Sequence, residues 1–452
     1  MARYGYFWGC YAQGRLPHIE KSTRAVIECL GADCADLDGL TCCPEKTMIK
    51  NMSHQTWLIT AARNLAVAEE AGVDFLTPCP GCFGTLKGAA AEIAGGADCH
   101  GDVNRELRRV GRSYRGVARV SHMLELFHRD IGLAAIRERV THPMTGMRIA
   151  VHYGCHLLQP SADLALDDPA RPAKFDELVQ ALDATSIPYE SKLSCCGGLL
   201  SRVEDDETGQ AMARRKLRDV TEERADAICL ACPSCFMQYD TTQLLLQRKG
   251  EELHLPVLYY TELLGLALGL QPDELGISSH RIDVRPFLER WQARRSAVAR
   301  VEEHWDYALL RRCAECGACA SDCPVARADL TFDPNRIIRQ LAAGQVEQVL
   351  RAGEFWRCLE CYTCREACFQ RYSMLDIFRT AKHLAVERGA TPAGSAEGMA
   401  AFRRAARLVE GSASQRKRLG LPDLPASGGE ELAQLLQDED AAAGGAEKEC
   451  AR

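Results

Sequence analysis

The chain has 452 residues, of which 46% are hydrophobic and 26% charged, and its formal net charge is −7. This composition is typical of a globular protein of two or three domains, and the charge gives no reason to expect nucleic acid or an anionic membrane as a partner. No apolar run approaches the roughly 20 residues of a membrane span, and the N-terminus lacks a signal-peptide pattern. We therefore expect a cytoplasmic protein, whose 23 cysteines indicate metal or redox chemistry because disulfides are rare in that compartment.

Residues 1–277 contain one cysteine pattern twice. In each copy a short β-prone stretch ends in Gly-Cys, an adjacent Cys-Cys pair follows 31 or 39 residues later, and Cys-Pro-x-Cys follows the pair after 35 residues. This repeat indicates an internal duplication. Its cysteines are Cys10, Cys42, Cys43, Cys79 and Cys82 in the first copy, and Cys155, Cys195, Cys196, Cys232 and Cys235 in the second.

Strands and helices are predicted to alternate in both copies. The apolar runs before the cysteine motifs predict strands, as do those at 120–127 and 257–264. Helices are predicted over Thr56–Ala71, with Gly72 as the stop, and over Thr208–Arg224 with a charged face in solvent. Such alternation predicts α/β layers around a mostly parallel sheet, with ligands at the loops beyond the strand ends. We expect two duplicated Rossmann-like lobes, residues 1–145 and 146–277, each presenting five thiols.

Residues 278–300 are interpreted as a linker that leads into a charged helix near 286–312, and residues 301–390 as a mainly α-helical, ferredoxin-type domain. Its motif C-x2-C-x2-C-x3-C occurs twice, 34 residues apart, followed once by proline and once by Phe369. In ferredoxins of this spacing three cysteines bind one [4Fe–4S] cluster and the fourth binds the other. Zinc, the alternative, favours two C-x2-C pairs. We expect one cluster on Cys313, Cys316, Cys319 and Cys368, and a second on Cys358, Cys361, Cys364 and Cys323.

Five thiols in each duplicated copy exceed the four that a cubane cluster or a structural zinc needs. Neighbouring cysteines point in different directions, which suggests a larger or irregular cluster. The segments FWGC, TCCPEK, VHYGCHLLQPS and SCCGG resemble the cysteine-rich CCG domain family, and the tandem copies over residues 1–277 resemble the B subunit of the heterodisulfide reductases. Residues 300–385 resemble the C subunit of the same complexes, although the order of the two parts is reversed relative to the fused membrane-linked form.

The resemblance implies a noncubane [4Fe–4S] cluster on the five cysteines of each lobe and a disulfide-type substrate between the two clusters. It also implies a larger redox complex with a flavin- and iron–sulfur-containing partner similar to the A subunit of those reductases. We expect no flavin or nucleotide on this chain, which lacks both a GxGxxG turn after a strand and a P-loop. The alternatives are zinc in one or both lobes and a non-catalytic electron-transfer role in a larger complex, such as an electron-bifurcating complex or an aromatic acyl-CoA reductase.

Several residues outside the ligand sets also carry expectations. His156 follows Cys155 and is a candidate proton donor to a departing thiolate or an orienting residue, whereas His152 is expected to pack in the core. Residues 391–452 are expected to form a low-complexity, disordered tail that contains the spare thiol Cys450. Four further cysteines are expected to be inert buried residues, namely Cys29, Cys34, Cys99 and Cys229.

Overall fold

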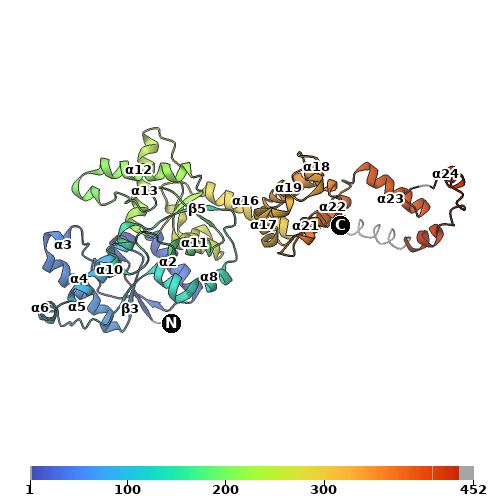
Figure 1. Cartoon of the computed structure of the whole chain (residues 1–452). Coiled ribbons are helices and arrows are strands. Elements are labelled where there is room, and N and C mark those ends of the chain that lie inside the picture. The colour runs from blue at the N-terminus through green and yellow to red at the C-terminus, as the bar shows by residue number, and fades with distance from the viewer. Residues whose placement is uncertain (1–2, 410, 437–452) are drawn as a thin grey trace. The chain divides into compact units, whose positions relative to one another are not determined.

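A computed structural model describes residues 3–409 and 411–436 of the chain (Figure 1). The chain divides into two compact units, Met1–Arg295 and Ser296–Arg452, each with its own hydrophobic core. In the described ranges, every helix is too short or too polar to cross a membrane.

The first unit contains two parallel sheets of four strands each. Their strand orders, β2-β1-β3-β4 and β6-β5-β7-β8, are the same plan repeated, and every neighbouring pair is parallel. The predicted duplication and the parallel α/β architecture are therefore confirmed. The strands are β1 (Tyr4–Tyr6), β2 (Cys34–Ala35), β3 (Asp74–Thr77), β4 (Val120–His122), β5 (Arg148–His152), β6 (Thr185–Ile187), β7 (Ala227–Leu230) and β8 (Val257–Tyr259).

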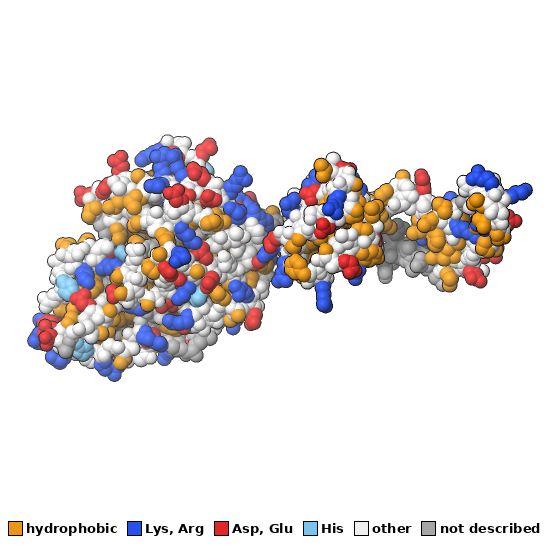
Figure 2. All heavy atoms as spheres, in the orientation of Figure 1, with side chains coloured by type: hydrophobic (Ala, Val, Ile, Leu, Met, Phe, Trp, Pro, Cys, Tyr) orange, Lys and Arg blue, Asp and Glu red, His pale blue; other side chains and the backbone are white. Residues whose placement is uncertain are grey.

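The helices that cover these sheets begin and end at recognisable residues. Helix α4 (His54–Ala71) begins after Ser53, whose Oγ accepts the Thr56 N–H at 3.2 Å, and ends at Gly72 with φ +68°. Helix α12 (Asp206–Glu222) begins after Asp205, which accepts the Thr208 N–H. Both predicted helices are confirmed to within two residues. Figure 2 shows acidic and basic side chains mixed over the outer face of α12, as its pattern predicts.

Further helices connect the strands and extend both lobes of the first unit. They are α1 (Gly9–Gly14), α2 (Pro17–Leu30), α3 (Ile49–Met52), α5 (Pro80–Ala94), α6 (Ala97–Arg108), α7 (Met123–Glu125), the π-helix η1 (Leu126–Gly132), α8 (Leu133–Arg139), α9 (Cys155–Leu158), α10 (Ser161–Leu164), α11 (Lys174–Gln180), η2 (Leu200–Val203), α13 (Pro233–Arg248), α14 (Tyr260–Ala267), α15 (Pro272–Leu275) and η3 (Ile277–Ser279).

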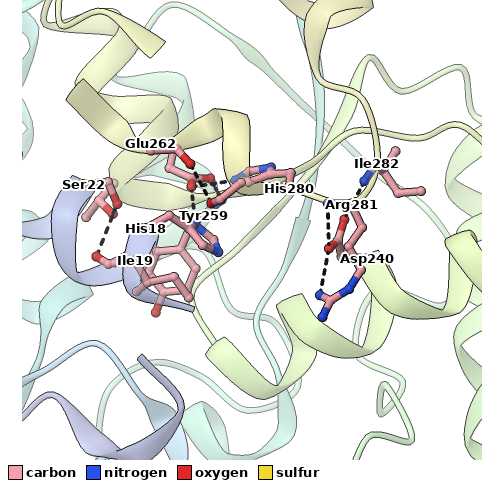
Figure 3. A network of polar contacts seen from close by, with 12 residues as sticks. His18, Ile19, Ser22, Asp240, Tyr259, Glu262, His280, Arg281 and Ile282 are labelled. Atoms are coloured by element: carbon pink, nitrogen blue, oxygen red, sulfur yellow. Dashed lines mark hydrogen bonds and ion pairs between the residues drawn. The ribbon is translucent and has the colours of Figure 1, made fainter. Parts of the chain in front are cut away.

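Helices of each lobe of the first unit pack against helices of the other lobe. Helix α2 of the first lobe packs on α14 and α15 of the second, and α9 and α10 of the second pack on α5 of the first. At the first of these contacts, His18 Nδ1 lies 2.7 Å from Glu262 Oε1, and His280 Nε2 lies 2.8 Å from the same oxygen (Figure 3). Helix α1, which carries Cys10, packs on α13 of the second lobe, and α9 carries Cys155, so the first cysteine of each lobe lies at the boundary between the lobes.

The second unit is built from short helices around a core that includes Ile338, Phe355 and Ile377. The charged helix predicted near 286–312 is in fact two helices, because the chain breaks after Glu302 and Asp306 starts the second by accepting the Leu309 N–H at 2.9 Å. Helix α16 (Arg285–Glu302) begins in the first unit and ends in the second. The remaining helices of the second unit are α17 (Tyr307–Cys316), η4 (Ala318–Ala320), α18 (Pro324–Ala328), α19 (Pro334–Ala342), α20 (Val346–Ala352), η5 (Glu354–Arg357), α21 (Thr363–Glu366), α22 (Met374–Glu387), α23 (Ala393–Ala405) and α24 (Ala413–Arg418).

One expectation is corrected by the fold, and the disordered tail over residues 391–452 stays a prediction. Within that range, residues 393–405 and 413–418 form α23 and α24, both without buried residues, while Cys450 lies outside the described residues. Among the four cysteines expected to be buried, only Cys229 is; Cys34 and Cys99 are partly exposed, and Cys29 is exposed. Cys29 points outward because α2 buries the opposite face, which contains Val26, Ile27 and Leu30.

Candidate metal centres

One cavity of about 640 Å³ in the first unit is lined by all ten cysteines of the duplicated pattern. In each lobe, Gly-Cys follows one central strand, β1 or β5, and Cys-Pro-x-Cys follows the other, β3 or β7. The strand order reverses between these central strands, and the carboxyl ends of parallel strands at such a point are where α/β proteins bind ligands. The predicted thiols of both lobes are thus brought to one place.

In the first lobe the cysteines approach one another closely enough to share protons. Hydrogen bonds from Cys42 and Cys82 lower the pKa of the buried Cys43 thiol to about 6. Gly9, with φ +74°, is required beside them, because a Cβ at this position would lie 2.7 Å from Cys82 Sγ. Asn64, fully buried, holds the Cys-Cys loop by donating to Cys42 O and accepting the Thr41 N–H.

In the second lobe, Cys196 Sγ and Cys235 Sγ are 3.3 Å apart. The backbone N–H groups of Gly197 and Gly198 donate to the sulfurs of Cys195 and Cys196, each at 3.4 Å. Hydrogen bonds from Cys155 and Cys196 lower the pKa of Cys195. A thiolate is therefore the favoured form of Cys195, and thiolate is the form that binds metal.

The donor set fits an iron–sulfur cluster. Each lobe offers five sulfurs at the edge of the shared cavity, and the second lobe adds N–H donors that stabilise anionic sulfur. Glycines also stand in direct contact with the thiols of the second lobe: a Cβ on Gly154 would lie 3.6 Å from Cys235 Sγ, and one on Gly198 would lie 3.4 Å from Cys196 Sγ, both at van der Waals distance.

Other residues complete the cavity wall. His156, on α9 beside Cys155, lines the cavity together with Glu45, Met48 and Leu199. Apolar and thiol groups thus make up much of the wall, as is typical of small-molecule sites.

The sequence pattern did not reveal the role of Lys216. Its side chain is only 1% exposed, and its Nζ donates to Ser194 O at 2.8 Å, to Lys192 O at 3.0 Å and to His152 Nδ1 at 3.0 Å. His152 is buried as expected but also belongs to this polar contact. The position of Lys216 on the apolar face of α12, between Ala213 and Val220, is the sequence feature that could have predicted its burial.

In the second unit, the structure groups eight cysteines into the two sets that their spacing predicts. One small cavity is lined by Cys323, Cys358, Cys361 and Cys364. The other is lined by Cys313, Cys316, Cys319 and Cys368. In both sets the fourth cysteine comes from the other motif, because the chain between the motifs folds back on itself through α19 and α20.

Comparison with known proteins defines the class. Residues 4–87 and 149–240 match the model of the cysteine-rich domain CCG, and residues 309–371 match the 4Fe–4S dicluster domain. The protein is therefore an iron–sulfur protein with duplicated cysteine-rich domains followed by a dicluster domain.

Three relatives refine this class. The B subunit of a ferredoxin/F420H2-dependent CoB–CoM heterodisulfide reductase of Methanosarcina acetivorans is 38% identical over 64% of this chain and 97% of that protein. A protein of Archaeoglobus profundus that is like the C subunit of heterodisulfide reductase is 30% identical over 29% of this chain and 70% of that protein. The 8-methylmenaquinol:fumarate reductase membrane anchor subunit of Wolinella succinogenes is 30% identical over 62% of this chain and 97% of that protein. The chain belongs to the family of heterodisulfide reductase B subunits and carries a part related to the C subunits.

Proposed function

We propose that the protein is a redox subunit that reduces a disulfide-type compound in the cavity between its two cysteine-rich lobes. The observation that carries this proposal is that the ten cysteines of both lobes line one cavity of about 640 Å³. Small-molecule sites typically have volumes of roughly 300–1,000 Å³, and this cavity lies within that range.

We propose four clusters. Two cubane [4Fe–4S] clusters would be held by the two cysteine sets of the second unit, and two noncubane [4Fe–4S] clusters by the five cysteines of each lobe. When bound, such clusters supply single-electron transfer and iron sites for sulfur. Two electrons are needed to cleave one disulfide, and a pair of clusters facing one cavity meets that requirement.

The overall reaction is RSSR′ + 2e⁻ + 2H⁺ → RSH + R′SH. The electrons come from a flavin-containing partner and enter at the dicluster domain. The chain's own contribution is to hold the disulfide between the lobes and to deliver protons. His156 lines the cavity next to Cys155 and is suited to protonate a departing thiolate.

A second candidate function is electron relay without disulfide chemistry. It is favoured by the likeness to the membrane anchor subunit of an 8-methylmenaquinol:fumarate reductase, an enzyme named for a quinol and a dicarboxylate and not for a disulfide. In that role the same clusters would pass electrons to another member of a larger complex.

Turnover by the purified full chain distinguishes the two candidates. With reduced viologen as donor and a panel of low-molecular-weight disulfides as acceptors, the proposed function predicts thiol release that requires intact clusters. Chain with the same iron and sulfide content that releases no thiol from any disulfide, while still exchanging electrons with the dye, would contradict disulfide reduction and favour the relay.

A further inference from the structure

The internal duplication allows the surroundings of the two cysteine-rich sites to be compared position by position. In both copies 35 residues separate Cys-Cys from Cys-Pro-x-Cys, so positions in that interval correspond one to one. Lys216 corresponds to Arg63, while Gly197 and Gly198 correspond to Pro44 and Glu45. All three differences affect how well the site stabilises the added negative charge of a reduced cluster.

The first difference is a buried cation. Lys216, 1% exposed, directs its ammonium group to the carbonyls of Lys192 and Ser194, which lie just before the Cys195–Cys196 pair. Burial lowers the pKa of Lys216 to about 8, against the opposing effect of the neighbouring cysteines, so the ammonium form still predominates at neutral pH.

The corresponding Arg63 of the first lobe is placed differently. It donates to Gly39 O, three residues before the Cys42–Cys43 pair, but it is only partly buried. A charge removed from water acts more strongly on its surroundings than a solvated one, because the local dielectric constant is lower.

The second difference lies in the backbone donors. Gly197 and Gly198 both donate N–H groups to cysteine sulfurs of the second lobe. In the first lobe Pro44 has no N–H to donate, and Cys42 receives a backbone hydrogen bond from Glu45. Hydrogen bonds to sulfur stabilise the more negative, reduced state of a cluster.

The third difference is a carboxylate. Glu45 lines the cavity on the side of the first lobe, where the second lobe has Gly198. A negative charge beside a cluster disfavours reduction. The greater exposure of Cys10 and Cys42 acts in the opposite sense, since water also stabilises added charge.

We propose that the chain gives the cluster site of the second lobe a more positive reduction potential than the site of the first lobe. The second lobe is then reduced first and holds its electron, and the first lobe is the stronger reductant toward a bound disulfide. Lys216 is a positioning and charge-setting residue in this assignment and does not contact the substrate. The inference rests on the proposed cluster content of both lobes.

The test is an EPR-monitored redox titration of the reconstituted full chain. Cys43→Ser and Cys196→Ser first assign the signals of the two lobes. We expect the second-lobe signal to have the more positive midpoint. Lys216→Met should lower that midpoint and leave the first-lobe midpoint unchanged. A tenfold change in the reduction equilibrium, the order of effect expected, corresponds to about 59 mV for one electron.

Two further variants keep the test decisive if Lys216→Met does not fold. Glu45→Gln should raise the first-lobe midpoint and bring the two midpoints closer together, because it removes the negative charge beside that site. The amide oxygen can still accept the Thr47 N–H, so the local structure is kept. Lys249→Met, which removes an exposed charge from the same lobe as Lys216, should move neither midpoint. Equal midpoints, a more positive first lobe, or a Lys216→Met midpoint equal to that of the parent would overturn the inference.

The outcome is separable from that of the proposed function. Midpoints ordered as proposed in a chain that reduces no disulfide would contradict the proposed function and leave the inference standing. Iron content near 8 per chain, counting roughly four irons per cluster, would overturn both.

Discussion

Cys196 Sγ lies 3.3 Å from Cys235 Sγ, although the two residues belong to different motifs 39 positions apart. Cys196 belongs to the Cys-Cys loop, whose preceding carbonyl, Ser194 O, accepts a hydrogen bond from Lys216. Cys235 lies in the first turn of α13. Their approach shows that the two motifs of the second lobe form one site.

Loss of Cys196 should therefore remove the metal of one lobe only. We expect Cys196→Ser to lower iron and acid-labile sulfide by about a quarter, from roughly 16 to roughly 12 per chain, counting four irons per cluster. Cys29→Ser, at an exposed cysteine outside the motifs, is the control and should keep the full content. Equal metal content in both variants would contradict the assignment of Cys196 as a ligand.

The grouping of cysteines in the second unit predicts crossed ligation. Cys368 lines the cavity of Cys313, Cys316 and Cys319, not that of its own motif. Cys368→Ala and Cys316→Ala should thus abolish the same EPR signal, whereas Cys323→Ala should abolish the other one. Loss of the same signal in Cys368→Ala and Cys361→Ala would show that each motif binds its own cluster.

Gly9 and Gly154 offer a matched pair. Both have positive φ, +74° and +79°, so alanine carries a backbone penalty at each, and at Gly154, with ψ 145°, the conformation is one that glycine almost alone adopts. The added Cβ would lie 2.7 Å from Cys82 Sγ in the first case and 3.6 Å from Cys235 Sγ in the second. We expect Gly9→Ala to lose the first-lobe iron while Gly154→Ala retains the second-lobe iron. Equal loss would mean that backbone strain, not crowding of Cys82, is decisive.

The contact of Glu262 with His18 and His280 should make stability depend on pH. Burial opposes charge on Glu262, but the histidines outweigh it and lower the pKa of the carboxyl from 4.5 to about 2. Burial likewise opposes charge on His280, but Glu262 outweighs it and raises the pKa above 6.5. The stabilisation from the Glu262 carboxylate is present above pH 4.5 and is lost as the pH falls toward 2. The stabilisation from protonated His280 is complete below pH 6.5 and is lost as the pH rises through its raised pKa.

Stability from this contact should accordingly be greatest between about pH 4.5 and 6.5. Glu262→Gln should lower the free energy of unfolding in urea by about 3 kcal/mol at pH 5.5, because it leaves the buried charge of His280 unpaired. The loss should be smaller at pH 8, where less of His280 is protonated and less charge remains to be paired. Glu262 also accepts the Tyr259 N–H at 2.7 Å at the start of α14. Glu125→Gln is the control, because Glu125 accepts the His122 N–H at 2.9 Å at the start of α7 in the same way but contacts no pair of histidines. A pH-independent loss in Glu262→Gln would contradict the charged contact.

His156 should affect catalysis without affecting the clusters. If it protonates the departing thiolate, His156→Gln should lower disulfide turnover by roughly a hundredfold, the lower range for general acid catalysis. Iron content and midpoint potentials should stay unchanged. His54→Gln, at a histidine 53% exposed on α4, should turn over as the parent chain does. Cluster loss in His156→Gln would instead assign the residue to cluster binding.

Much of the fold follows from local pattern. The apolar runs before Cys79 and Cys232 predict β3 and β7 because parallel strands buried on both faces need continuous apolar residues. Ser53 and Gly72 determine the ends of α4 through a side-chain cap and a left-handed backbone. The spacing of the eight cysteines in the second unit predicted how they would group, because residues three apart on a short turn face one centre.

The tertiary structure alone decided which residues surround these sites. In the sequence, Lys216 is one of several charged residues on an amphipathic helix. Only the packing of α12 against the Cys-Cys loop allows its ammonium group to donate a hydrogen bond to Ser194 O. His18 and Glu262 are 244 positions apart, and no local pattern relates them. The strands and helices could be predicted from the sequence because they depend on short-range hydrogen bonding and side-chain periodicity, and the cysteine motifs could be recognised from their spacing. The meeting of both lobes at one cavity depends on long-range packing between α2 and α14 and between α9 and α5, which local preferences do not encode.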